Sequence, residues 1–177
     1  MLETQDDLET LQALLDRSYA AAGPHLRRIH DPERRPSAEE LAERLTGMRQ
    51  LVLATVTADG RPITGPVDGI FHRGAFHFGS AVDSLRFRHI RARPQVSATH
   101  LPGEEFAVTV HGRAVPVDVR APESMSLRET LLQVYVPLYG SDWEHDFLDA
   151  AGSASGSDPP QYARIEAERM FAFRTPT

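Results

Sequence analysis

The chain has 177 residues and no cysteine, so it suits one domain and excludes disulfides, thiolate metal sites and cysteine nucleophiles. Its formal net charge of −6 disfavours broad binding of nucleic acid. The N-terminus is acidic and polar and no apolar run reaches the length of a membrane span, so we expect a cytoplasmic protein without membrane contact.

Two helices are predicted before residue 49. The first covers residues 2–22, where apolar residues recur at three- and four-residue steps, namely Leu8, Leu11, Leu15 and Tyr19. Gly23-Pro24 predicts its end, and residues 26–36 then read as a polar, basic connector. The second helix begins at Ser37, in capping-box spacing with Glu40. Its buried stripe is expected at Leu41, Leu45 and Met48.

Strands follow from residue 51 onward. Alternating apolar residues and turn signals predict them over residues 51–57, 61–72, 75–80, 95–101 and 105–119. Asp59-Gly60 predicts a tight turn. Proline and glycine kink the second strand or place it at an edge. Gly112 predicts a bulge in the long fifth strand.

The C-terminal third alternates helix and strand. Residues 122–139 are predicted helical, with one face formed by Leu127, Leu131, Val134 and Leu138. A further helical piece is expected near 143–151, then a flexible connector over 152–160 and a last strand over 161–173. These elements predict a mainly β fold, a small antiparallel barrel flanked by helices. We divide it into an N-terminal helical extension (1–48) and a barrel domain (49–177) with a helical insertion (122–151).

The segment from Phe76 to Pro94 carries the clearest chemical signal. A strand ends at Gly79-Ser80, and a small polar loop leads to Ser84, which can cap a helix over residues 84–92. The free amides of a helix's first turn favour an anion, and Ser80, Ser84 and Arg86 can add hydrogen bonds to it. This arrangement predicts a compact phosphate pocket. The alternative for a short helix with four arginines is a solvated basic face.

The order of residues around this segment resembles a known family. The matching residues are Leu53-Ala54-Thr55, Asp59-Gly60-Arg61-Pro62, Pro66-Val67, Phe76-His77-Phe78, Ser80, Ser84, Arg86, Pro94 and Gly112. Together they resemble the pyridoxamine 5′-phosphate oxidase-like, FMN-binding split-barrel superfamily. In that family a Ser-x-Lys/Arg motif opens a helix that ends before a proline, as Ser84-Leu85-Arg86 and Arg93-Pro94 do here.

The resemblance implies a split antiparallel β-barrel of the flavin-reductase and PNP-oxidase type, working as a homodimer with a cofactor pocket at the interface. It implies that Gly79, Ser80, Ser84 and Arg86 hold the phosphate and ribityl chain of FMN. It also implies that the strand Thr64, Gly65, Pro66 and Val67 lies along the isoalloxazine ring, where a glycine permits close approach.

Three departures from the family pattern concern, in turn, the affinity for phosphate, the partner subunit's contribution to the pocket and the substrate. Leu85 stands where the vitamin-metabolising oxidases often have a second basic residue, and Ala107 stands near a position that is often polar. The last residues, MFAFRTPT, lack the Arg-Leu-x-Pro ending that helps those oxidases hold substrate. We therefore expect a substrate other than pyridoxamine phosphate.

Other candidate residues give weaker signals. The eight histidines show no metal spacing, and for each an ordinary hydrogen-bonded or surface role is favoured. For a haem ligand, His77 and His111 are the first choices. Asp68 could act as a proton relay or end a strand ladder. The aromatic residues of the insertion, Tyr135, Tyr139 and Trp143, are those of a small core or of a cover over the cofactor.

The sequence thus predicts an FMN-dependent oxidoreductase that transfers a hydride or two electrons to or from a nicotinamide nucleotide or small organic acceptor. No motif for a nucleophilic serine, a carboxylate pair or a metal is present, so the catalytic residues are unknown. Three alternatives remain. They are a deazaflavin coenzyme in place of FMN, a flavin- or haem-binding protein without turnover, and a cofactor-free dimer that acts as a partner or regulator.

Overall fold

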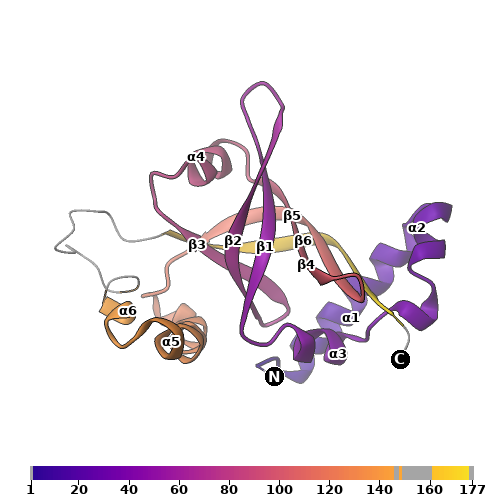
Figure 1. Ribbon diagram of the computed structural model, residues 1–177, viewed down its shortest axis with the longest axis horizontal. Helices are drawn as coiled ribbons and strands as arrows, with labels where there is room; N and C mark the ends of the chain where they lie inside the picture. The colour runs from indigo at the N-terminus through magenta and orange to yellow at the C-terminus, as the bar shows by residue number, and fades with distance from the viewer. Residues whose placement is uncertain (1, 146–147, 149–160, 176–177) are drawn as a thin grey trace.

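Six antiparallel strands close into a barrel in the order β1-β2-β3-β6-β5-β4 (Figure 1). The computed structural model describes residues 2–145, 148 and 161–175. The strands are β1 Met48–Val56, β2 Pro62–His72, β3 Ala75–Ser80, β4 Gln95–Gly103, β5 Phe106–Val117 and β6 Gln161–Arg174. The helices are α1 Gln5–Ala20, α2 Pro24–Ile29, α3 Ala38–Arg44, α4 Leu85–Ala92, α5 Met125–Tyr139 and α6 Asp142–Glu144, with 3₁₀ turns η1 Pro32–Arg34 and η2 Pro122–Ser124. The predicted split β-barrel with peripheral helices is confirmed.

A bulge lies opposite Gly112, but the extra residue belongs to β6 and not, as predicted, to the fifth strand: His111 pairs with Arg169 and Gly112 with Ala167, which leaves Glu168 unpaired. The register between these strands shifts between His111 and Gly112. A Cβ atom added to Gly112 would lie 2.0 Å from the carbonyl oxygen of Glu166, a distance that no side chain tolerates. The glycine therefore lets the bulged strand β6 pass close to β5.

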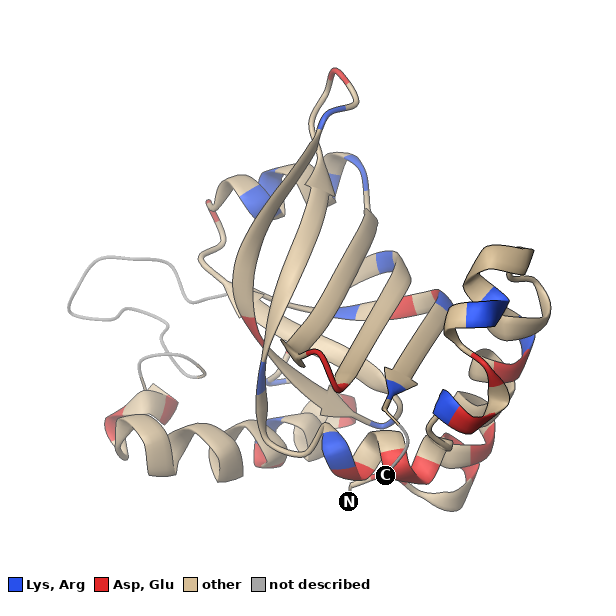
Figure 2. Cartoon of the chain, turned by 45° about the vertical axis from the view of Figure 1, so that its right-hand side comes forward, with Lys and Arg blue, Asp and Glu red and all other residues tan. Residues whose placement is uncertain are grey.

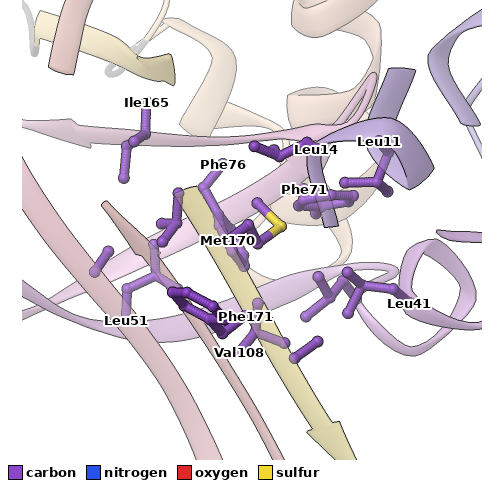
Figure 3. Close-up of a cluster of buried hydrophobic side chains, with 14 of the residues drawn as sticks. Leu11, Leu14, Leu41, Leu51, Phe71, Phe76, Val108, Ile165, Met170 and Phe171 are labelled. Atoms are coloured by element: carbon purple, nitrogen blue, oxygen red, sulfur yellow. The ribbon is translucent and has the colours of Figure 1, made fainter. Parts of the chain in front are cut away.

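One hydrophobic core fills the barrel and continues into the N-terminal helices (Figure 3). Leu11 and Leu14 of α1 and Leu41 of α3 are buried beside Phe76 and Met170 of the sheet. The predicted stripes of α1 and α3 are confirmed, except that Met48 belongs to β1 and is only partly buried. The helices before residue 48 therefore share their core with the barrel.

The N-terminal helices also cover an open edge of β6. β3 pairs with β6 only from His77↔Arg164 to Ser80↔Gln161, so the rest of β6 has no strand on that side. From α1, Ser18 Oγ accepts from the backbone N–H of Met170 at 3.0 Å. Tyr19 Oη donates to the carbonyl of Ala172 at 2.8 Å and accepts from its N–H at 3.0 Å. Side chains of α1 thus replace the missing strand, which also protects the edge from pairing with another chain.

Two local predictions were wrong. Pro24 does not merely end the first helix but occupies the first turn of α2, where its missing N–H is not needed. The polar connector predicted over 26–36 is mostly helical as a result. In α5, which contains Pro137, the buried side chains include Leu127, Leu131 and Tyr135, whereas Leu138 is 57% exposed.

A second, smaller core lies between α5 and the outer face of the sheet. It contains Ile70 of β2, Leu131 and Tyr135 of α5, Trp143 and Tyr162 of β6. The helix expected near 143–151 appears as the short α6, and most of residues 146–151 and the connector 152–160 lie outside the described residues. None of the helices in the described residues is long and apolar enough to span a membrane.

Candidate functional site

The barrel is split where β2 and β3 separate. These strands pair only from Gly69↔Phe78 to His72↔Ala75. Beyond that point β2 remains paired with β1 along residues 62–68, and Gly79 and Ser80 pair with β6 instead. The backbone of β2 from Pro62 to Asp68 therefore has no β3 partner, and α4 follows from the end of β3 at this opening.

Arg86 of α4 spans this split. Its Nη2 donates to the carbonyl oxygen of Pro66 on β2 at 2.8 Å, and its Nη1 donates to Ser80 Oγ on β3 at 3.2 Å. A Cβ atom on Gly65 would meet Nη2 at 3.5 Å, which is ordinary contact distance. The guanidinium thus lies between the two strands that the sequence predicted to hold the ring and the phosphate.

The positive charge of Arg86 is half-buried and has no counter-charge in the part of the chain that the structure describes. No carboxylate forms an ion pair with it within the described residues. Burial lowers the pKa of the guanidinium from its usual value, although the group stays charged. A guanidinium has five N–H donors, and two are used here. The other donors can bind an anion that enters the split.

The start of α4 adds further donors beside Arg86. Ser84 is its N-cap, and its Oγ accepts from the backbone N–H of Phe87 at 3.3 Å. The first amides of the eight-residue helix have no intrahelical acceptor, which favours a negative group at this end. The structure therefore brings together Ser80, Ser84, Arg86 and Pro66, four of the predicted site residues.

The remaining predicted residues have different surroundings. Thr64 is exposed and lies opposite Ala54 of β1. Val67 is 8% exposed and packs in the barrel core, so only its backbone can face a ring. Gly79 lies against Tyr162, because an added Cβ atom would be 2.8 Å from Cε1 of that tyrosine.

Tyr162 is the site neighbour that sequence reasoning missed. It is 6% exposed, and burial raises the pKa of its hydroxyl. The signal that places it here is the β3–β6 pairing, which aligns Gly79 with Tyr162. No local motif could have revealed a pair so distant in the sequence. Beside it, Asp68 lies close enough to Tyr135 for its charge to raise the pKa of that tyrosine, although burial is the larger cause.

The arginines of the α4 region, where Figure 2 shows positive residues in blue, differ in their contacts. Arg91 donates from Nη1 to the carbonyl of Val82 at 2.9 Å, and Arg93 donates from Nε to the carbonyl of Val56 at 3.0 Å. Both therefore fix backbone. Arg88 is exposed, as the solvated-face interpretation expected. Only Arg86 of the four spans the split.

The insertion forms an aromatic stack over the smaller core. Tyr135 lies between Tyr139 and Trp143, with ring centroids 6.0 and 4.7 Å away. Tyr135 and Trp143 are buried, whereas Tyr139 is 59% exposed. Most of this stack therefore belongs to the smaller core.

The geometry of a split barrel with a capped, arginine-bearing helix agrees with the comparison to known families. A family model described as pyridoxamine 5′-phosphate oxidase matches residues 37–172, more than half of the chain. The chain belongs to the pyridoxamine 5′-phosphate oxidase-like family. The matched range includes α3, β1 to β5 and nearly all of β6. By sequence, no protein of curated function matches the chain.

Several solved structures share the fold of this chain at low sequence identity. A conserved hypothetical protein from Mycobacterium tuberculosis is 21% identical with a TM-score of 0.63, and the match covers 81% of this chain and 88% of that one. An FAD-binding protein from Mesorhizobium loti is 22% identical with a TM-score of 0.54, covering 77% and 92%. A haem-binding protein from Mycobacterium smegmatis is 19% identical with a TM-score of 0.56, covering 79% and 59%. Membership of the family alone does not define the cofactor.

Proposed function

We propose that this protein is an FMN-dependent oxidoreductase whose flavin phosphate binds at Arg86. The observation that carries the proposal is a half-buried guanidinium with no carboxylate partner among the described residues, held across the split by Pro66 and Ser80. A phosphate monoester would accept from the unused N–H groups of Arg86, the hydroxyls of Ser80 and Ser84, and the first amides of α4.

The strand beside Arg86 suits a flat heterocycle. In the split, the backbone of Thr64 to Val67 has no β3 partner, and Gly65 leaves room beside it for close approach. Backbone N–H groups of this strand would bind and orient the ring, and Tyr162 and Tyr135 would limit water on the side of the smaller core. The flavin supplies the two-electron chemistry, so no side chain of the protein has to act as a nucleophile.

The protein is also proposed to act as a homodimer with the cofactor at the interface. Val52 of β1 is 52% exposed and Leu101 of β4 is 64% exposed on the outside of the barrel. Val52 lies opposite both Thr99 of β4 and Pro66 of β2. A second copy seated on Val52 would therefore reach the strand that contacts Arg86. Exposed apolar side chains on adjacent strands are the expected feature of such an interface.

Absorption spectroscopy tests the proposed function. Purified protein, or protein mixed with FMN and freed of excess, should show a bound flavin spectrum that bleaches when a reduced nicotinamide nucleotide is added without oxygen. Mass spectrometry of the released cofactor distinguishes FMN from a deazaflavin, whose phosphate could use the same donors. A protein that takes up haem but no flavin, or flavin that no nicotinamide nucleotide reduces, would contradict the proposal.

Glutamate substitution tests the dimer. Val52→Glu should convert the protein to a monomer in size-exclusion chromatography and weaken FMN binding together with dimerisation. Leu138→Glu is the matched control, because Leu138 is similarly exposed on α5. A Val52→Glu protein that remains dimeric would contradict this interface.

A further inference from the structure

A second polar cavity lies on the outer face of β3, β5 and β6, beneath the start of α5. Its volume is about 470 Å³, within the range of small-molecule sites. Its lining includes His72, His77, Ser124, Ser126 and Leu127. His77 precedes Ser80 by three residues on β3, about 10 Å along the strand, and none of the predicted flavin-site residues lines the cavity. It is therefore a site separate from the split.

His77 contributes an imidazole nitrogen that no group of the described residues satisfies. The side chain is 6% exposed. Its Nδ1 lies 3.2 Å from the carbonyl oxygen of Ala75, an acceptor, so Nδ1 carries the proton. Its Nε2 is then a bare acceptor, with no hydrogen-bond partner among the described residues. Within the described residues, every fully buried side-chain nitrogen or oxygen has a hydrogen-bond partner. Because Nε2 of His77 has none, it is not fully buried. Since His77 lines the cavity, Nε2 reaches it.

His72 has the same tautomer. Its Nδ1 lies 3.2 Å from Oγ1 of Thr130, whose only proton is donated to the carbonyl of Ser126 at 3.0 Å. His72 must therefore donate from Nδ1, and its Nε2 accepts only a long contact of 3.4 Å from Ser126 Oγ. The two rings are 5.8 Å apart. The floor of the cavity thus offers two neutral imidazole acceptors and needs a ligand with a hydrogen-bond donor.

The charges around the cavity determine which donor fits. Arg73 and Arg164 line it, and Arg164 is paired with Glu166 at 2.6 Å. Burial keeps both histidines neutral by lowering their pKa values, that of His77 to about 3, and the charges of Arg73 and Arg164 act in the same direction. Asp7 opposes this effect at His72 but is the smaller influence.

Two carboxylates complete the rim. Asp118 is engaged by Arg120 at 3.5 Å, and Glu123 is exposed. The positive charges of Arg73 and Arg164, which disfavour protonation of the imidazoles, would also disfavour a metal ion at the floor of the cavity. The described residues contain no group of three or more metal-ligating side chains. An ammonium group at the floor would meet the same field. A neutral hydroxyl or N–H donor does not, and the two arginines suit a carboxylate on the same molecule.

We propose that this cavity binds a small organic carboxylate that also carries a hydroxyl or neutral N–H donor. The donor binds Nε2 of His77 and His72, the carboxylate faces Arg73 and Arg164, and the apolar part contacts Leu127 and Val115. The site is independent of the proposed flavin, so loss of one does not predict loss of the other.

Long-range ¹H–¹⁵N NMR of the histidine rings tests the proposal with 4-hydroxybenzoate as the probe. The spectrum of the free protein should show the Nδ1–H tautomer for His77. Titration should move the Nε2 signals of His77 and His72 saturably, with a Kd of about 1 mM as expected for a ligand of this size. 4-Methoxybenzoate, which cannot donate, and 4-hydroxybenzyl alcohol, which has no carboxylate, should each bind at least about tenfold more weakly.

Two arginine variants provide the matched control. Arg164→Gln should weaken binding of 4-hydroxybenzoate about tenfold, and Arg169→Gln should leave it unchanged, since both residues are exposed on β6 but only Arg164 lines the cavity. Both changes are at the surface, so the test does not depend on a variant of buried His77 that folds.

Three results would overturn the proposal. They are no saturable shift of His77 up to about 20 mM probe, equal binding of the three compounds, and Zn²⁺ binding to both imidazoles more tightly than 4-hydroxybenzoate.

Discussion

Replacing Arg86 with alanine should remove phosphate recognition while leaving ring recognition intact. The substitution deletes the half-buried charge and the N–H groups that face the split. One hydrogen bond to a charged group is worth about 1.5–3 kcal/mol, so the Kd for FMN should rise by a factor of about 10–150. Riboflavin, which has the same ring and no phosphate, should bind wild type and variant within about twofold.

Quenching of flavin fluorescence during titration measures the affinities of wild type and Arg86→Ala for FMN and for riboflavin. Arg88→Ala is the control on the same helix, because the side chain of Arg88 is exposed and has no hydrogen bond or ion pair within the described residues. It should change FMN affinity by less than about twofold. The reasoning is refuted if Arg86→Ala binds FMN like wild type. It is refuted equally if riboflavin loses as much affinity as FMN, because Arg86 would then act on the shape of the split rather than on the phosphate.

Three further predictions concern the fold. Gly112→Ala places a Cβ atom 2.0 Å from the carbonyl oxygen of Glu166 and should cost about 3 kcal/mol, lowering Tm by about 6–12 °C in a thermal melt; an unchanged Tm would contradict the close crossing. Tyr19→Phe leaves the N–H of Ala172 without its partner, while the carbonyl of Ala172 keeps a contact with Nδ1 of His30 at 3.0 Å; it should lower Tm by about 4–8 °C, whereas exposed Tyr139→Phe should not, and equal effects would argue against the edge cover. Burial lowers the pKa of His77 to about 3. Between about pH 6.5 and 3 the unfolded chain therefore binds more protons than the folded one, so the free energy of unfolding decreases as the pH is lowered. Urea unfolding should therefore show wild type losing about 2 kcal/mol relative to His77→Gln between pH 7 and 5, and a pH-independent difference would be evidence against a buried neutral imidazole.

The strands and turns were predictable because their signals are local. Alternation of apolar residues and the turn at Asp59-Gly60 determined β1 to β3 within a few residues, and Gly112 marked the position of the irregularity, although the bulge itself lies in β6 opposite this glycine. The face of α5 was not predictable in the same way. The 3.6-residue pattern favoured Leu138, yet the core beneath α5 takes Tyr135, whose ring stacks on Trp143. The partner on the sheet, rather than the helix pattern, decides which side chain is buried.

The site residues also differ in whether the sequence signal that reveals them is local. Ser84 and Arg86 lie on one short helix, so their motif was visible in the sequence, and the cap at Ser84 formed as expected. The hydrogen bond from Arg86 to Pro66 could not be predicted from the sequence, because it depends on where β2 and β3 separate. The cavity at His77 was equally hidden, since Arg164 reaches it only through the β3–β6 pairing.

A crystal structure of the protein with FMN tests the central claim most directly. The account predicts phosphate oxygens about 2.7–2.9 Å from the guanidinium nitrogens of Arg86, between Ser80 and the first turn of α4, with the ring along Thr64 to Val67. A flavin whose phosphate lies away from Arg86, with that side chain still bound only to Pro66 and Ser80, would contradict it.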